Sequence, residues 1–96
     1  MLRMLWVAAY DVSDDRQRRL LEKRLASTGE RVQFSVFESW LSARERTRLM
    51  RTVDSEVLLQ GSSDSVRWYG LCGHCQRQLR FVGRGIQPDD PRYYVV

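Results

Sequence analysis

Two stretches of the chain carry the clearest hydrophobic patterns, and a helix-length segment separates them. Residues 4–10 are apolar at every position, which is typical of a central strand covered on both faces or buried at a subunit contact. In residues 31–38, apolar side chains alternate with polar ones, as in a strand with one buried face. Because one helical crossover fits between these stretches, we expect a small α+β domain.

The segment between the two stretches, and another that follows them, have the pattern of amphipathic helices. Four residues at helical spacing form an apolar stripe on the first helix: Leu20, Leu21, Leu25 and Thr28. Ser13 is the expected N-cap of this helix, and Gly29 is a natural C-terminal stop. A second helix is predicted over residues 43–53, with Ser42 as its N-cap.

The strand tract after Arg31 does not keep one phase. Its apolar positions slip by one near residues 35–37, and a slip of one residue in a strand moves side chains to the opposite face. We therefore expect a bulge or a tight reversal there, which would divide the tract into two strands. Further along, residues 65–71 alternate as in a strand, and residues 79–82 are a short strand candidate.

Composition and charge indicate a folded chain that suits a polyanionic partner. A hydrophobic fraction of 43% excludes a disordered chain, whereas 96 residues bury little core, so we expect a partner chain to contribute stability. The formal net charge is +4, and Lys23 is the only lysine among the 16 basic residues. Arginine's planar fork suits phosphate oxygens, which favours nucleic acid; a solvated arginine-rich surface is an equally good interpretation.

The sequence also bears on the cellular compartment. No stretch is apolar over the roughly 20 residues that a bilayer-spanning helix needs, and the start of the chain lacks a signal-peptide pattern. We therefore expect a cytoplasmic protein that does not enter a membrane. In that compartment, Cys72 and Cys75 are expected to be reduced thiols.

The tetrapeptide from Cys72 to Cys75 has a histidine between the two cysteines, a spacing that resembles the redox centre of thioredoxin-class isomerases. A thiol–disulfide oxidoreductase is therefore one alternative function. However, the chain up to the next strand is too short for a long helix that would lower a thiol pKa. A zinc site would lack a ligand. A turn with two reduced thiols is the preferred interpretation.

Asp11 is the candidate catalytic and metal-binding residue. It comes directly after the first strand and just before a helix, at the kind of strand end where α/β proteins place reactive groups. Mg²⁺ is commonly bound by one or two carboxylates together with substrate phosphate, and a twofold axis could supply a second acid. The alternative is structural, because Asp11 could cap the helix or pair with an arginine.

Residues near Asp11 offer candidate contacts with nucleic acid. Three arginines in the first turns of the predicted helix could meet phosphates or only solvate the helix: Arg16, Arg18 and Arg19. Tyr10 could orient a phosphate or a water, although a tyrosine at a strand end most often packs in the core. Phe37 is more typical of a core or subunit contact than of a base-stacking platform.

Three strings of residues, spread over almost the whole chain, resemble the CRISPR-associated protein two family. They are Tyr10-Asp11-Val12-Ser13-Asp14-Asp15 with the arginines that follow, the stretch from Gly29 to Glu38, and Asp64-Ser65-Val66-Arg67-Trp68-Tyr69. The most specific string is Arg31-Val32-Gln33-Phe34-Ser35-Val36-Phe37-Glu38.

The resemblance implies a ferredoxin-like β-α-β-β-α-β domain over residues 1–85 and a C-terminal extension over residues 86–96. It also implies a homodimer, in which the strand at residues 79–82 crosses to the partner. Such a protein takes part in CRISPR spacer acquisition, where it binds the CRISPR integrase and holds duplex DNA. Several family members are also described as endonucleases that use Mg²⁺, or Mn²⁺, to cut DNA or single-stranded RNA.

Carried over by position, the resemblance assigns metal binding to Asp11, with one copy from each subunit facing across the dimer axis. It associates six further positions with the nuclease cleft or its support: Tyr10, Ser13, Arg18, Arg31, Ser35 and Phe37. Leu20 departs from some nuclease-active relatives, which have an arginine there. A non-catalytic scaffold dimer is the competing function. Residues 93–96 are the candidate contact with the integrase, as an added strand.

Overall fold

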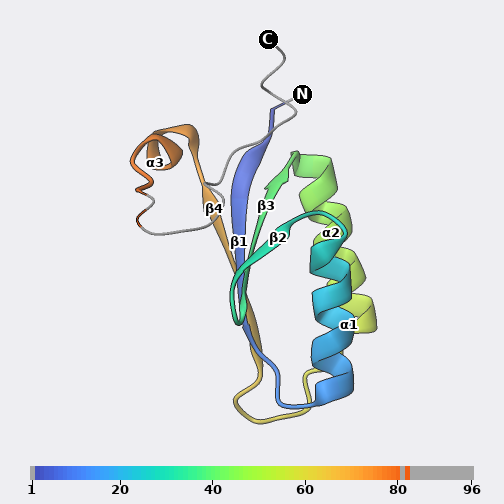
Figure 1. Cartoon of the computed structure of the whole chain (residues 1–96). Coiled ribbons are helices and arrows are strands. Elements are labelled where there is room, and N and C mark those ends of the chain that lie inside the picture. Colours follow the sequence, from blue (N-terminus) through green and yellow to red (C-terminus); the bar gives the residue numbers. More distant parts are fainter. Residues whose placement is uncertain (1, 81, 83–96) are drawn as a thin grey trace.

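The computed structural model describes residues 2–80 and residue 82. The elements in chain order are β1 (Met4–Asp11), α1 (Asp15–Ala26), β2 (Glu30–Gln33), β3 (Val36–Leu41), α2 (Ala43–Glu56), β4 (Ser65–Leu71) and the short α3 (Gly73–Arg77). The four strands form one antiparallel sheet in the order β2-β3-β1-β4, and α1 and α2 lie on one of its faces (Figure 1). The expected ferredoxin-like fold is therefore confirmed. Within the described residues, no helix is long and apolar enough to span a bilayer.

Strand β1 holds the sheet together because it pairs along both of its edges. Ala9 lies opposite Val36 of β3 on one side and opposite Arg67 of β4 on the other. Alternate residues of β1, including Ala8 and Tyr10, belong to the core beneath the helices. The intervening residues therefore face the other side of the sheet, which α1 and α2 leave uncovered (Figure 1). We call this side the open face.

The slip in the strand pattern corresponds to a reversal of the chain. β2 ends at Gln33 and β3 begins at Val36, so only Phe34 and Ser35 connect the two strands. The backbone N–H of Tyr10 donates a hydrogen bond of 3.1 Å to the carbonyl oxygen of Ser35, which ties this turn to the end of β1. The predicted division of the tract into two strands is confirmed.

The helix caps explain where α1 and α2 begin. Ser42 caps α2 as predicted: its hydroxyl accepts from the N–H of Glu45 at 3.2 Å, and the Glu45 carboxylate accepts from the N–H of Ser42 at 2.8 Å. The cap of α1 is Asp14, whose carboxylate accepts from the N–H of Gln17 at 2.9 Å. The prediction that Ser13 caps α1 was wrong, because aspartate serves equally well as an N-cap and the helix begins one residue later.

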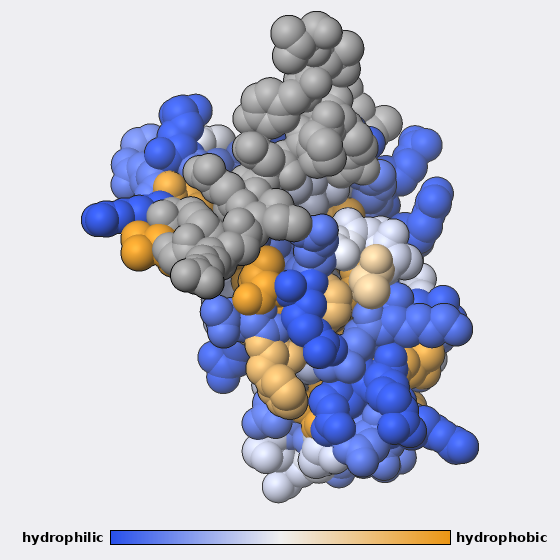
Figure 2. Space-filling model, in the orientation of Figure 1, coloured by the Kyte–Doolittle hydropathy of each residue, from blue (hydrophilic) through white to orange (hydrophobic). Residues whose placement is uncertain are grey.

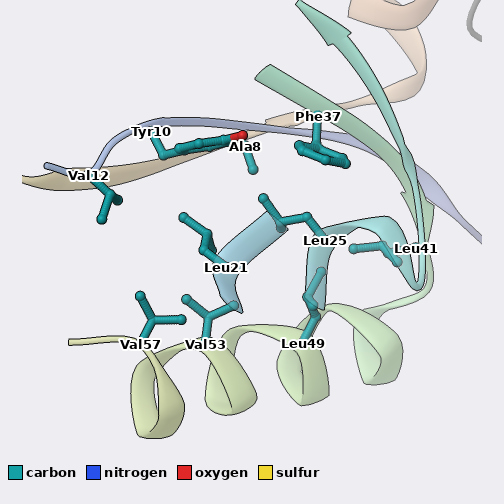
Figure 3. Packing of buried hydrophobic residues seen from close by; sticks show 10 residues of the cluster. All are labelled: Ala8, Tyr10, Val12, Leu21, Leu25, Phe37, Leu41, Leu49, Val53 and Val57. Atoms are coloured by element: carbon teal, nitrogen blue, oxygen red, sulfur yellow. The ribbon is translucent and has the colours of Figure 1, made fainter. Parts of the chain in front are cut away.

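The hydrophobic core lies between the sheet and the two helices (Figure 3). Leu21 and Leu25 of α1 are fully buried, which confirms the apolar stripe, but Leu20 is half-buried and Thr28 is exposed. Ten residues from both layers make up the core cluster: Ala8, Tyr10, Val12, Leu21, Leu25, Phe37, Leu41, Leu49, Val53 and Val57. Tyr10 is thus a core residue, although it directly precedes the candidate catalytic acid.

Two glycines are required where other groups approach the backbone closely. A Cβ on Gly70 of β4 would lie 2.7 Å from the Trp6 ring, so the glycine makes room for the indole. The same ring also contacts Arg46, whose guanidinium lies 5.3 Å from the ring centroid. A Cβ on Gly29, just after α1, would lie 2.3 Å from the carbonyl oxygen of Glu38. Gly29 therefore lets the chain turn tightly against β3.

The described structure ends shortly after β4. The helix α3 forms where a turn was predicted, and Leu79 and Arg80 after it are not in a strand. Residue 81 and residues 83–96, which include the predicted extension and its tail at 93–96, lie outside the described residues. A terminal strand that crosses to a second protomer stays a prediction.

Replacing Leu25 with alanine tests the assignment of the core. We expect the free energy of unfolding to fall by about 2–5 kcal/mol, because the change removes buried methyl groups and leaves a cavity. The same change at the half-buried Leu20 is the matched control and should cost clearly less. Urea unfolding followed by tryptophan fluorescence measures both losses. Equal losses would contradict the burial pattern of α1.

Candidate nucleic-acid and metal site

Asp11 is the last residue of β1 and lies on the open face. Its predecessor Tyr10 points into the core, and successive side chains of a strand point to opposite faces. Asp11 is exposed, and its carboxylate has no ion pair or hydrogen bond with any other described residue. The structure therefore brings neither a helix cap nor an arginine to this carboxylate, and it is free to meet a ligand.

Two residues of β4 lie next to Asp11 on the open face. Ser65 is directly opposite Asp11, and Arg67 is opposite Ala9, which places Arg67 diagonally beside the acid. Arg67 is exposed, and its guanidinium forms no ion pair with any described residue. Sequence reasoning missed this cation. The period-two alternation in residues 65–71 groups it with Ser65 and Tyr69, but the alternation does not show that this row lies beside β1.

The predicted site residues Tyr10, Arg31 and Phe37 are brought together, but on the helix side of the sheet. The Tyr10 hydroxyl donates a 2.6 Å hydrogen bond to the carboxylate of Glu22, which also forms an ion pair of 2.7 Å with Arg31. The Arg31 guanidinium lies 5.5 Å from the centre of the Phe37 ring. Burial and the bond to Glu22 raise the pKa of Tyr10 to about 12. The interpretation of Tyr10 and Phe37 as packing residues is confirmed.

The loop that follows Asp11 is held by side chains from two directions. Arg18 of α1 donates a hydrogen bond of 3.1 Å to the carbonyl oxygen of Val12. From the other side, the Asp64 carboxylate accepts from the backbone N–H of Ser13 at 3.0 Å and from that of Gly61 at 3.0 Å. These backbone donors, Gly61 first, lower the pKa of Asp64. Ser13 and Arg18 thus fix the backbone next to Asp11.

The remaining predicted contacts have different surroundings. Arg16 and Arg19 are exposed on α1 and have no ion pair with any described residue, so both stay available for phosphate. Ser35 is half-buried in the β2–β3 turn, where its carbonyl oxygen holds the backbone of Tyr10. Its part in the site is therefore to position the end of β1.

The cysteine pair lies at the far end of β4 from Ser65. Both thiols are free and exposed, and their sulfur atoms are 3.6 Å apart. Hydrogen bonds from the N–H and thiol of Cys75 lower the pKa of Cys72, whereas the neighbouring Cys72 raises the pKa of Cys75. No third ligand joins them, because the described residues contain no group of three His, Cys, Asp or Glu that could hold a metal ion. The expected pair of free thiols is confirmed, on a short helix rather than a simple turn.

Asp11 offers an exposed carboxylate for a cation at the end of β1. Mg²⁺ keeps several waters and is commonly bound by one or two carboxylates plus phosphate oxygens. The exposed and unpaired Asp11 fits such an ion as one protein ligand. No group of three His, Cys, Asp or Glu side chains within the described residues of one protomer could complete such a site, so a second copy of the chain would be a source of further ligands.

The fold and the free acid at the end of the central strand define a small ferredoxin-like protein with a candidate phosphodiester site. The chain belongs to the CRISPR associated protein Cas2 family, whose model matches residues 4–79. It is 39% identical over 79 residues to the CRISPR-associated endoribonuclease Cas2 3 of Synechocystis, an alignment that covers 82% of this chain and 84% of the relative.

Solved structures agree with this assignment. The hypothetical protein TT1823 from Thermus thermophilus has a TM-score of 0.73 and 38% identity, and the match covers 91% of this chain and 99% of that one. A chain of a partial Cas6-RT-Cas1–Cas2 complex has a TM-score of 0.57 and 23% identity, with 82% and 90% covered. At that identity the second match supports the fold alone.

The Tyr10→Phe variant tests the cluster on the helix side. Because the folded state raises this pKa above its ordinary value of 10.0 to about 12, the contribution of Tyr10 to stability is complete below pH 10. It is lost as the pH rises from about 10 to about 12. The variant should lack the last tyrosine to ionise in an absorbance titration, and its stability should fall less over this pH range. A missing ionisation near pH 10 instead would contradict the buried hydrogen bond.

Proposed function

We propose that this chain acts in CRISPR spacer acquisition as a cytoplasmic homodimer that binds nucleic acid and hydrolyses phosphodiester bonds of RNA or DNA with Mg²⁺. One observation carries the proposal: Asp11 has an exposed carboxylate without an ion pair to any described residue, at the end of the central strand and on the face that α1 and α2 leave uncovered. The endoribonuclease name of the Synechocystis relative supports hydrolysis as the reaction.

The homodimer is supported by the character of the open face. On β1 this face carries the partly exposed Val7 and Ala9 before Asp11, and on β4 it carries Tyr69, which is 50% exposed. On the side of the protein seen in Figure 2, small hydrophobic patches lie among hydrophilic residues. A chain of this size gains stability when such a face is buried against a second copy. A twofold axis through the open face would relate two copies of Asp11.

In this arrangement Asp11 would be the protein ligand of the ion in each protomer. Mg²⁺, when bound, polarises the scissile phosphate and lowers the pKa of a coordinated water. Arg67, beside Asp11 on the same face, would neutralise phosphate charge. Arg16 and Arg19 of α1 would contact further phosphates along the bound nucleic acid. Two Asp11 carboxylates that face each other repel, so a cation bound near them would also favour the dimer in which the two acids are close.

A non-catalytic scaffold is the second candidate function. The observation that favours it is that the described residues of one protomer contain no group of three potential metal ligands, which leaves a metal site dependent on how the two copies meet. In this case the dimer would hold duplex DNA for the CRISPR integrase, and its arginines would contact the backbone without cleavage. Family membership supports this partner, and the integrase contact at residues 93–96 stays a prediction.

Replacing Asp11 with asparagine separates the two functions. The amide keeps the shape of the side chain but loses the charge, so we expect Mg²⁺-dependent cleavage to fall by about 100-fold or more, while folding is unchanged. Cleavage of labelled RNA and DNA by highly purified protein is measured with and without Mg²⁺, beside a spacer-integration assay. Asp54→Asn, an exposed acid on α2, is the matched control. Unchanged cleavage by D11N would rule out the proposed catalysis, and intact integration would leave the scaffold role in place.

The dimer interface is tested by Tyr69→Arg. Tyr69 is 50% exposed on the open face, so a charge there should be tolerated by the protomer but not by a buried contact between two copies. We expect light scattering to report half the wild-type mass. Leu58→Arg is the control, because Leu58 is 55% exposed but follows α2, away from the open face. A dimer that persists in Tyr69→Arg would place the contact elsewhere.

A further inference from the structure

Cys72 and Cys75 lie at the end of β4 that is remote from the candidate site. Asp11 is opposite Ser65 at the start of β4, whereas Cys72 directly follows Leu71 at its end. At about 3.4 Å per residue, the length of this strand keeps the thiols roughly 20 Å from Asp11. The helix α3 lies past the end of β4, at the edge of the sheet and away from α1 and α2 (Figure 1). The pair is therefore outside the apolar part of the open face that the proposed homodimer would bury.

The start of α3 holds the two thiols in contact. Cys72 is the N-cap of this helix, and Cys75 is its third residue. The same spacing in α2 lets the side chain of Ser42 reach the backbone of Glu45 in a capping box. In α3 this spacing brings the two sulfur atoms to 3.6 Å. A disulfide bond is about 2.05 Å long, so a movement of about 1.5 Å, within the reach of side-chain rotation, would join them.

A small set of hydrogen bonds holds α3 in place. The backbone N–H of Gln76 donates to the carbonyl oxygen of Cys72 at 2.9 Å. The backbone N–H of Gln78 donates to that of Cys75 at 3.1 Å. The side-chain amide of Gln76 donates to the carbonyl oxygen of Leu71 at 2.6 Å, which joins the helix to β4. All residues of α3 are at least partly exposed, and such a short helix opens easily. A covalent link between its N-cap and its third residue would hold it closed.

The surroundings of the thiols are cationic. Residues 65–80 contain no Asp or Glu, but three arginines and a histidine. Arg77 reaches back over the first turn of α3, because a Cβ on Gly73 would lie 3.6 Å from its Nη1. Hydrogen bonds from the N–H and then the thiol of Cys75 lower the pKa of Cys72, which makes Cys72 the better nucleophile of the pair. Both thiols are exposed, and positive charge beside them attracts an anionic reagent.

We propose that Cys72 and Cys75 form a redox modification site, at which a small anionic disulfide such as oxidised glutathione converts the two thiols into an intramolecular disulfide that fastens α3. The Cys72 thiolate attacks one sulfur of the reagent, whose S–S bond breaks, and the released thiolate takes up the proton that Cys72 gave up. Cys75 then attacks the sulfur of Cys72 in this mixed disulfide, and its proton goes to the second thiolate that leaves. The pair is oxidised by two electrons, and the reagent is reduced to two thiols.

This role differs from that of an oxidoreductase, because the group that changes is the protein's own helix. Disulfides are rare in a reducing compartment, and those that form there are usually transient and redox-sensing or catalytic. Because Cys75 already contacts Cys72 within one protomer, closure of the ring outcompetes a disulfide between two copies. The redox state of the pair therefore sets how firmly α3 is held on β4.

The full-length protein is equilibrated with stepped ratios of reduced to oxidised glutathione, quenched with acid, alkylated and measured by mass spectrometry. We expect the wild type to change from two alkylated cysteines to none, to retain no glutathione, and to revert fully with excess reduced glutathione. Cys75→Ser should keep one glutathione on Cys72, because the second step is missing. Oxidation should slow hydrogen exchange at the amides of Gln76 and Gln78 about threefold or more. The amide of Glu45 in α2 is the control and should not change.

A second comparison tests the charge of the reagent. Arg77→Gln should slow the reaction of Cys75→Ser with oxidised glutathione about threefold, but not its reaction with the uncharged hydroxyethyl disulfide. Arg48→Gln, an exposed arginine on α2, is the matched control and should leave both rates unchanged. Glutathione that stays on the wild type, a disulfide between two copies, thiols that do not react in the native protein, or unchanged exchange in α3 would each overturn the inference. It is independent of the proposed catalysis, since Asp11→Asn leaves both thiols in place.

Discussion

The pairing of β1 with a strand on each side is the constraint on which the rest of the structure depends. It places an apolar strand at the centre of the sheet, and successive side chains of that strand point to opposite faces of the sheet. Tyr10 faces the helices and joins the core, so its successor Asp11 has to face the open side. The position of the acid therefore follows from core packing one residue earlier.

The two faces of the sheet serve different purposes at this end of β1. On the helix side, Tyr10, Glu22, Arg31 and Phe37 form a closed cluster in which each polar group has a partner. On the open side, Asp11 has none among the described residues. The contacts of this cluster support the strand end on the helix side, and a well-supported position is what an acid needs to hold a cation in one place. We regard this contrast as the basis of the candidate site.

Much of the fold was predictable because it depends on local patterns. The apolar run of β1, the stripe of α1, the capping box at Ser42 and the slip that marks the β2–β3 turn all act within a few residues. The errors were local as well. Asp14 rather than Ser13 caps α1, since neighbouring residues offered equivalent oxygen acceptors. A short helix replaces the predicted turn at Cys72, because one turn of helix needs little sequence to form.

The sequence by itself determined most of the elements and the family, and it singled out Asp11 as the candidate metal-binding residue. Only the tertiary structure decided which side chains share its face: the predicted neighbours Tyr10, Arg31 and Phe37 do not, whereas Arg67, which was not predicted, does. The physical reason is that strand register is set by hydrogen bonds between segments far apart in the chain, and a shift of one residue exchanges the two faces. Periodicity shows that side chains alternate, but it cannot show which residues of another strand will lie beside them.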